Sequence, residues 1–304
     1  MATFYNYISD QEKLQRQYRL TVQDVDENDN PIKKATVIDS SESPITMKFK
    51  VNRSLFEDAN TMEVELYNLA PKTYNRLFFD FFNRNGRTII LEAGYKGQVL
   101  STIFIGDVWS CYTSRQGSDI ITRIEAIVGV KSFSANIDVT LRGATRNQIL
   151  RRAAKDMALD IDIYSGDDIK FNRSVSLSGS AIGVIQKYSD HTAFIDEGKI
   201  KILKDEDAFK GSVVLINDEA GLLGVPKHED AILTIDMIFE PRIVIGQIIE
   251  IKSRIMPPFD GQYKVYGVKH EGIISDTTSG KATTTLEMLV GNNVYGRFHV
   301  KTKQ

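Results

Sequence analysis

Alternation of apolar and polar residues is the dominant pattern in the first 135 residues. Met47, Phe49 and Val51 alternate with two lysines, and residues 62–66 repeat the pattern with two glutamates. Side chains along a strand point to opposite faces in turn, so each segment predicts a strand with one buried and one solvated face. Further strands are expected at 88–95, 102–112 and 119–127, with a hairpin loop at 114–118.

A helix is predicted where this spacing changes near residue 140. Thr145 and Gln148 form a capping-box signature, and apolar residues then recur at helical spacing as far as Met157. Pro71 favours the start of a shorter helix, because proline suits a first helical position. A second short helix near 180–189 and a tight hairpin near 194–203 complete a small α/β segment.

The alternating pattern returns after residue 205. Strands are expected at 213–216, 232–239, 247–252, 262–269 and 283–290. This second β region resembles the first in size and texture without a strict sequence repeat, so duplication is only suggested. We predict a mainly β (α+β) fold, in which two β domains (1–135 and 206–304), each a barrel or a sandwich, flank a small α/β insert (136–205).

Composition narrows the classes of function. A net charge of −2 in 304 residues gives no basic surface that would favour nucleic-acid binding. The lone Cys111 cannot form an internal disulfide, and its place between Trp109 and Tyr112 suits a small buried residue better than a nucleophile. The single tryptophan is expected to be buried as well. The sequence begins without a signal-peptide pattern and has no long apolar run, so we expect no secretory leader and no membrane insertion.

One acidic segment imitates a calcium loop. Residues 24–30 are rich in Asp and Asn, but the sixth and twelfth positions counted from Asp24 are Asp29 and Ala35. An EF-hand needs Gly and Glu at these positions, so an acidic hairpin loop is the better interpretation.

The histidines show no metal or catalytic spacing. His228 is followed by Glu229 and Asp230, but neighbours on an extended chain point apart, so a solvated turn is expected there. Motifs for a serine nucleophile, a phosphate loop or a zinc protease are missing from the sequence. We predict no catalytic, cofactor-binding or metal-binding residues. The four histidines are His191, His228, His270 and His299.

The segment 78–82 holds four phenylalanines around Asp80. A helix with aromatic residues on nearly all sides must be buried within its own domain or against a neighbouring subunit. Both alternatives stay open at this point.

Several short segments, in order along residues 40–290, resemble the central hub proteins of phage tail baseplates. The first is Tyr-Asn-Leu at 67–69, which ends a strand. Next come Gly94-Tyr95 and the segment Ile103-Phe-Ile-Gly106, similar to a strand pair in that family. The other segments that carry the resemblance are 114–126, 143–159, 221–226, 239–246, 263–272 and 283–287.

The resemblance implies a tail-tube-like double-barrel hub of a contractile-tail phage. In such hubs three chains form a ring of approximate sixfold symmetry. The implied partners are two further copies, a tail tube or tube-adaptor protein, a central spike protein and other baseplate proteins, with DNA only as passing cargo. The implied location is the virion tail baseplate, assembled in the host cytoplasm.

Three alternatives remain from the sequence. The chain could be the hub of a phage-derived injection machine or bacteriocin, which sequence does not separate from a phage hub. A tail-associated peptidoglycan hydrolase would need a catalytic group that the small insert does not display. A carbohydrate-binding β protein would need exposed Trp or Tyr clusters, which the expected burial of the single tryptophan disfavours.

Overall fold

The first β region forms an antiparallel sheet of seven strands. The computed structural model describes residues 15–26, 30–55, 59–78, 86–190, 193–209, 213–275, 280–289 and 299–301. Neighbouring strands follow the order β3-β4-β7-β6-β5-β1-β2. The elements are β1 (Arg16–Val25), β2 (Thr36–Asp39), β3 (Met47–Ser54), β4 (Thr61–Tyr67), α1 (Pro71–Leu77), β5 (Gly86–Tyr95), β6 (Ser101–Gln116) and β7 (Asp119–Ile127).

The second β region contributes the order β15-β16-β19-β18, with β17 on β18 and β14 on β17. A separate parallel pair joins β13 to β20. The elements are β13 (Asp207–Phe209), β14 (Val214–Asn217), β15 (Leu222–Glu229), β16 (Ile232–Ile238), β17 (Ile248–Lys252), the 3₁₀ turn η2 (Pro257–Phe259), β18 (Gly261–Ile274), β19 (Ala282–Leu289) and β20 (His299–Lys301).

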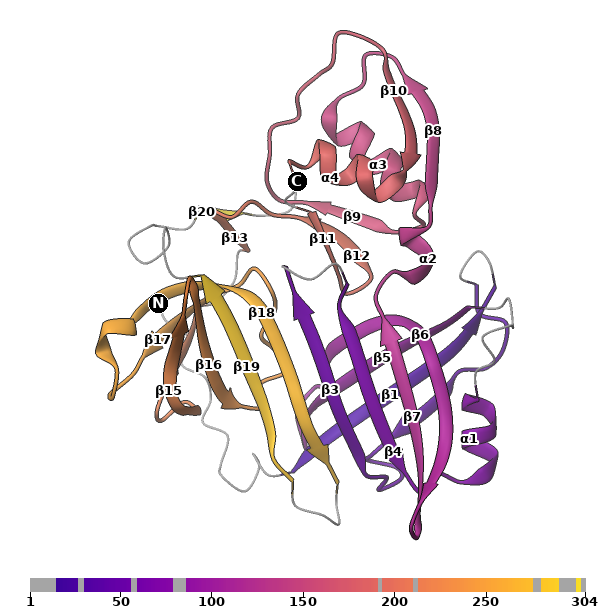
Figure 1. Cartoon of the computed structure of the whole chain (residues 1–304), viewed down its shortest axis with the longest axis vertical. Coiled ribbons are helices and arrows are strands. Elements are labelled where there is room, and N and C mark those ends of the chain that lie inside the picture. The colour runs from indigo at the N-terminus through magenta and orange to yellow at the C-terminus, as the bar shows by residue number, and fades with distance from the viewer. Residues whose placement is uncertain are drawn as a thin grey trace.

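The two regions share one sheet. β18 pairs antiparallel with β3, from Gly267 opposite Ser54 to Ile274 opposite Met47. We call this pairing the seam. Figure 1 shows the front strands of this sheet, from β15 on one side across the seam to β6 on the other, beyond which β5, β1 and β2 continue the order. The pairings among the described strands do not close either region into a barrel.

Strand order is repeated across the seam. The order β3-β4-β7-β6 in the first region matches β15-β16-β19-β18 in the second. In each repeat the strand that comes third in the sequence, β6 or β18, is long. Its first part pairs with an extra strand, β5 or β17. The structure therefore shows a duplicated topology, which the sequence only suggested.

A β-bulge occurs at the same place in both repeats. Pairing of β6 with β7 shifts between Val108 and Ser110, and pairing of β18 with β19 shifts between Val265 and Gly267. Trp109 and Tyr266 are the residues inside these bulges. Because a bulge adds one residue to one strand, two coincident bulges fix which positions are equivalent in the two repeats.

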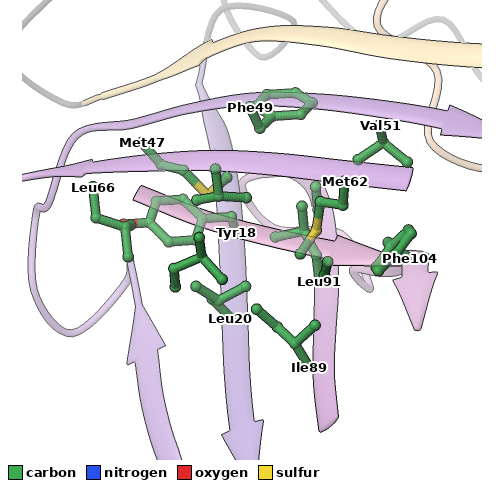
Figure 2. Close-up of a cluster of buried hydrophobic side chains, with 14 of the residues drawn as sticks. Tyr18, Leu20, Met47, Phe49, Val51, Met62, Leu66, Ile89, Leu91 and Phe104 are labelled. Atoms are coloured by element: carbon green, nitrogen blue, oxygen red, sulfur yellow. The ribbon is translucent and has the colours of Figure 1, made fainter. Parts of the chain in front are cut away.

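Each repeat has an apolar core on one face of the sheet. Figure 2 shows the first core, where Tyr18, Leu20, Met47, Met62 and Leu91 pack from four strands. The second core includes Leu233, Ile235, Val265 and Leu286. Burying each such side chain contributes roughly 1.5–3 kcal/mol, so these alternating positions hold the strands in register.

The insert packs two helices on two small sheets and has its own apolar core. Thr145 Oγ1 accepts from the N–H of Gln148, and Gln148 Oε1 accepts from the N–H of Thr145, as the capping box predicts. The elements are α2 (Val130–Phe133), β8 (Asn136–Leu141), α3 (Arg146–Asp156), β9 (Asp160–Ile163), β10 (Val175–Ser180), α4 (Ala181–Tyr188), β11 (Ala193–Asp196) and β12 (Lys199–Ile202).

The mainly β fold is confirmed, while one expectation about burial is wrong. Trp109 is 45% exposed rather than buried. The bulge changes the alternation there, so Val108 and Cys111 both face the core and Trp109 does not. The domain limits 1–135, 136–205 and 206–304 stay a prediction.

Phe78, the first residue of the phenylalanine cluster, lies just beyond the end of a helix. α1 stops at Leu77, and Phe78 follows it with 63% of its surface exposed. Phe78 is therefore not a core residue. The rest of the cluster, Phe79 to Phe82, lies outside the described residues.

Candidate functional site

The face of the shared sheet opposite the cores carries rows of charged residues that cross the seam. In the central row Lys50 lies opposite Glu271 on β18 and Glu63 on β4, and Glu63 lies opposite Glu125 on β7. We call this surface the polar face. Its charged members are Lys48, Lys50, Glu63, Glu65, Arg123, Glu125, Lys227, Asp236, Lys269, Glu271 and Glu287.

Acids and bases largely neutralise one another on the polar face. Arg123 Nε lies 2.9 Å from Glu65 Oε1, and Lys269 Nζ lies 2.7 Å from Glu271 Oε2. Such exposed pairs contribute about 0–1 kcal/mol each, so their main effect is on surface charge rather than on stability.

Glu65 is held ionised within its row. Burial by itself raises the pKa of Glu65, but hydrogen bonds from Arg123 and Tyr67 and the charge of Lys48 bring it below the ordinary value. The carboxylate therefore stays charged at neutral pH, and this row contains a fixed pair of opposite charges.

The central row differs because two acids face each other. Glu63 and Glu125 are register partners, and Glu125 Oε2 accepts a hydrogen bond from Ser110 Oγ at 2.9 Å. Like charges directly opposite each other destabilise a sheet. This row thus carries an acidic excess that folding alone does not require.

A shallow groove of about 420 Å³ lies on the polar face over the seam. Its floor is tight, since a Cβ on Gly272 would come within 2.5 Å of the Ala282 Cα. The groove is open and lined by charges of both signs. Its lining is Lys48, Phe49, Lys50, Glu63, Glu65, Glu271, Gly272, Ile273, Lys281 and Thr283.

Beneath the seam, His270 is fully buried against the ring of Phe239. Its Nδ1 lies 2.9 Å from Thr284 Oγ1, which also accepts from the N–H of Glu240. The rings of Phe239 and His270 meet edge to face at 5.5 Å. Burial, and then the charge of Arg53, lowers the pKa of His270 to about 3. The imidazole is therefore neutral and serves as packing, not as an acid or base.

A buried ionic cluster attaches the insert to the seam. Arg53 on β3 donates from Nε and Nη2 to Asp196 on β11, each at 2.9 Å, and Lys201 Nζ donates to Asp196 Oδ2 at 2.9 Å. Burial raises the pKa of Asp196, but the charges of Arg53 and Lys201 outweigh it and hold that pKa below its ordinary value. Asn60 adds a hydrogen bond to the Ile195 carbonyl at 3.0 Å.

Residues singled out from the sequence are scattered. Asp24 forms an ion pair with Arg87 at 2.6 Å, and Asp26 accepts from the N–H of Asn30 at 2.8 Å. Residues 27–29 lie outside the described part of the chain, as does His191. Within the described residues no group of three or more His, Cys, Asp or Glu side chains is placed to hold a metal ion.

The other candidates have structural surroundings. His228 and Glu229 end β15, and only Asp230 lies in the expected turn to β16; all three are exposed. Cys111 is buried, and burial raises the pKa of its thiol to about 11, so it is a poor nucleophile. In the part of the chain that the structure describes, no helix is long and apolar enough to span a membrane.

Comparison with known families decides the identity. The family model described as Baseplate hub gp41 matches residues 28–276. The chain belongs to this hub family. The resemblance found in the sequence is thereby confirmed, and the protein is a structural component of a phage tail baseplate. No curated protein matches the hub chain in sequence.

Solved structures show where else this fold occurs. The 43 kDa tail protein of prophage MuSo2 from Shewanella oneidensis aligns with a TM-score of 0.58 at 9% identity, over 90% of the hub chain and 98% of its own. A tail protein from Neisseria meningitidis MC58 gives 0.57 at 8%, over 90% and 97%. A chain of the lidded Francisella PdpA–VgrG complex gives 0.56 at 9%, over 95% of the hub chain and 54% of its own. These identities establish a shared fold alone.

Sequence reasoning did not find the polar face as a unit. Alternation predicted which residues of each strand are solvated, but the rows depend on register across strands from both ends of the chain. The Arg53–Asp196 pair was missed because 143 residues separate its members.

Proposed function

We propose that three copies of this chain form a ring of approximately sixfold symmetry at the centre of a phage tail baseplate. The observation that carries the proposal is the repeated strand order, which runs in the same sense on both sides of the seam. Repetition in one sense is what rotation about an axis produces, and a heterologous contact closes into a ring when the rotation closes. Two repeats in each of three chains give six similar units.

Such a ring can connect a sixfold component of the tail to a threefold one. Its six similar units fit the tail tube or a tube-adaptor protein on one side. Its three identical chains fit a threefold central spike on the other side, with other baseplate proteins around the rim. The tail is of the contractile type, and the ring assembles in the host cytoplasm before it becomes part of the virion.

The polar face lines the channel through which DNA leaves. A surface that passes a polyanion must not hold it, and the balance of acids and bases with an acidic central row meets this requirement. DNA is therefore cargo in transit. The chain is not an enzyme in this proposal, which is supported by the buried Cys111 and the neutral, buried His270.

The mass of the purified protein in solution tests the ring. Light scattering across a concentration series is expected to show a species of three chains. A mass of one chain at every concentration, which does not change when candidate tube and spike proteins are added, contradicts the proposal.

A further inference from the structure

β2 ends the strand order of the shared sheet, and one of its edges is open. Among the described strands it pairs only with β1. Its Ile38 packs into the first core together with Met47 of β3 and Met62 of β4. β2 therefore lies across that core from the polar face, so in the proposed ring its outer surface is turned away from the channel.

The helix α1 borders β2 at this end of the core. Leu77 anchors α1, since it is 1% exposed and packs in the first core. Arg76 Nη2 donates to the Lys34 carbonyl at 3.3 Å, which joins the last turn of α1 to the chain that leads into β2. Figure 1 shows α1 on the flank of the first repeat, away from the insert.

One ion pair holds these two segments together. Asp24 Oδ1 lies 2.6 Å from Arg87 Nε. The Asp24 carbonyl accepts from the N–H of Ile32 at 2.9 Å, and Arg87 Nη1 donates to the Phe78 carbonyl at 3.2 Å. The chain from Ile32 through β2 and the helix α1 with Phe78 thus form one continuous surface, which we call the β2 surface.

Large apolar side chains are exposed around the open edge. Val37 is 53% exposed, Ile32 43% and Phe78 63%. A short edge strand with lysines near it is a common protection against unwanted pairing. Protection does not require apolar side chains of this size beside the edge, because they favour the association that the charges oppose. Their presence indicates a surface that another chain covers.

The charge of the β2 surface is positive among the described residues. Asp24 and Asp39, on the two strands, are in ion pairs with Arg87 at 2.6 Å and Arg19 at 2.8 Å. Four exposed cations remain, and they favour an acidic partner. The cations are Lys33, Lys34, Lys72 and Arg76.

The β2 surface occurs once in each chain. Residues 239–247, which link β16 to β17 in the second repeat, are all described and contain no helix, whereas the link between β4 and β5 contains α1. Phe239 in that link is 1% exposed, in contrast to Phe78. A partner of this surface is therefore expected to bind at one molecule per chain, or three per ring.

We propose that the β2 surface binds an extended acidic and apolar segment of another baseplate protein, which adds to the open edge of β2 as a further strand. Val37 points away from the core, because its neighbour Ile38 points into it, and α1 lies on the core side. Side chains of a strand alternate between faces, so apolar residues of the partner contact Val37 while acidic residues meet Lys72 and Arg76. This inference deepens the proposed function, and it rests on the ring only for the outward position and the number of sites.

A labelled model peptide in which glutamate alternates with valine is the probe. Fluorescence anisotropy is expected to show saturable binding to the purified hub protein, at one peptide per chain. Hydrogen exchange is expected to slow within Thr36–Asp39 when the peptide binds, because a new strand protects the amides of the edge. A peptide with lysine in place of glutamate is expected to bind at least tenfold more weakly.

Matched charge reversals locate the site. Lys72→Glu with Arg76→Glu changes two cations four residues apart on α1, and Arg151→Glu with Lys155→Glu does the same on α3. The α1 variant is expected to bind the glutamate peptide at least tenfold more weakly than the wild type, because its cations select the acidic side chains. The α3 variant is expected to bind it like the wild type.

A second matched pair tests the apolar contact. Phe78→Ser is expected to weaken binding about fivefold, because the ring no longer loses solvent-exposed area in the complex. Ile169→Ser, at a residue of the insert that is 57% exposed, is expected to leave binding unchanged.

The outcomes separate the site from the ring. Absence of binding, equal binding of the two peptides, equal effects within the matched variants, or unchanged exchange at Thr36–Asp39 overturns the site. An assembly larger than three chains that only the α1 variant dissociates identifies a second copy as the occupant and overturns the proposed partner. A protein that binds the peptide as expected but stays monomeric overturns the ring and supports the β2 surface.

Discussion

His270 shows how one position has diverged between the two repeats. Through the aligned bulges its equivalent in the first repeat is Thr113, which is exposed on the second half of β6. His270 is buried because β3 covers it, and the same coverage lowers the pKa of its ring to about 3. The low pKa of His270 is therefore a consequence of its burial at the seam.

The histidine makes stability sensitive to mild acid. Its folded pKa lies below the ordinary 6.5, so the unfolded chain binds a proton that the folded chain does not. Stability is full above pH 6.5, falls as pH drops below it and levels off near the folded pKa. Between pH 7 and pH 5 this group is expected to cost about 2 kcal/mol, measured by urea unfolding.

Matched variants isolate that contribution. His270→Asn keeps a hydrogen-bonding group near Thr284 and removes the titration, so the loss between pH 7 and pH 5 is expected to shrink by this amount. His228→Asn, at the exposed end of β15, is expected to keep the full loss. Equal pH dependence in the two variants contradicts the assignment.

At the scale of elements, β3 and β11 are tied by a pair of buried charges. The side chains of Arg53 and Asp196 are each 2% exposed and lie 2.8 Å apart. Removing one member of a buried pair leaves the other charge uncompensated, which costs about 3–5 kcal/mol. This pair fixes the insert to the sheet at the strand that forms the seam.

Asp196→Asn is expected to lower the free energy of unfolding by about 3 kcal/mol, because Arg53 and Lys201 lose their shared carboxylate. Chemical denaturation measures the change. Asp160→Asn is the control, since Asp160 is exposed and lies 3.9 Å from Lys199, and its change is expected to stay within about 0.5 kcal/mol. Equal losses in the two variants contradict a special role for the buried pair.

Elements were predictable where local signals were strong. The capping box at Thr145, the alternation at 119–127 and the hairpin near Gly198 all gave the right type of element. β15 was missed because Gly224 and Pro226 interrupt its alternation, and both residues are unusual inside a strand. The exposure of Trp109 was missed because a bulge depends on the partner strand, which local sequence does not specify.

At the scale of the whole molecule, the charge balance of the polar face predicts that the protein does not bind DNA. The wild-type protein is expected not to retain DNA in a filter-binding assay at moderate salt. Changing Glu63, Glu125 and Glu271 to lysine converts the central row to a basic one. This variant is expected to bind DNA with an affinity that falls steeply with salt, because phosphate contacts release counterions.

A control variant places the same charge change elsewhere. Asp138, Asp167 and Glu206 are exposed outside the shared sheet, and changing them to lysine gives the same net charge. Weaker DNA binding by this control is expected, because in the proposed ring the polar face surrounds the channel and the control positions do not. Equal binding by both variants contradicts a channel-lining role.

The architecture of the whole molecule could be predicted from the sequence only through its resemblance to the hub family. Mainly β character followed from alternation, but the seam joins β3 to β18 across more than 200 residues, and no local pattern predicts such a pairing. In the sequence the duplication was visible only as a similar size and alternation pattern, because the repeats share topology rather than residues. Cys111 is structurally equivalent to Val268, and Thr113 to His270. Strand order is preserved by the need for a core on one face, which many different side chains satisfy.

The seam also bears on how fast a hub can form. In the proposed ring of three chains, half of the six junctions close when each chain folds, at the high effective concentration of an intramolecular contact. The remaining junctions require only three molecules to meet, so the nucleation rate rises with a lower power of protein concentration than it would for six separate units. A covalent link between the two repeats therefore shortens the expected lag before the first proposed ring forms.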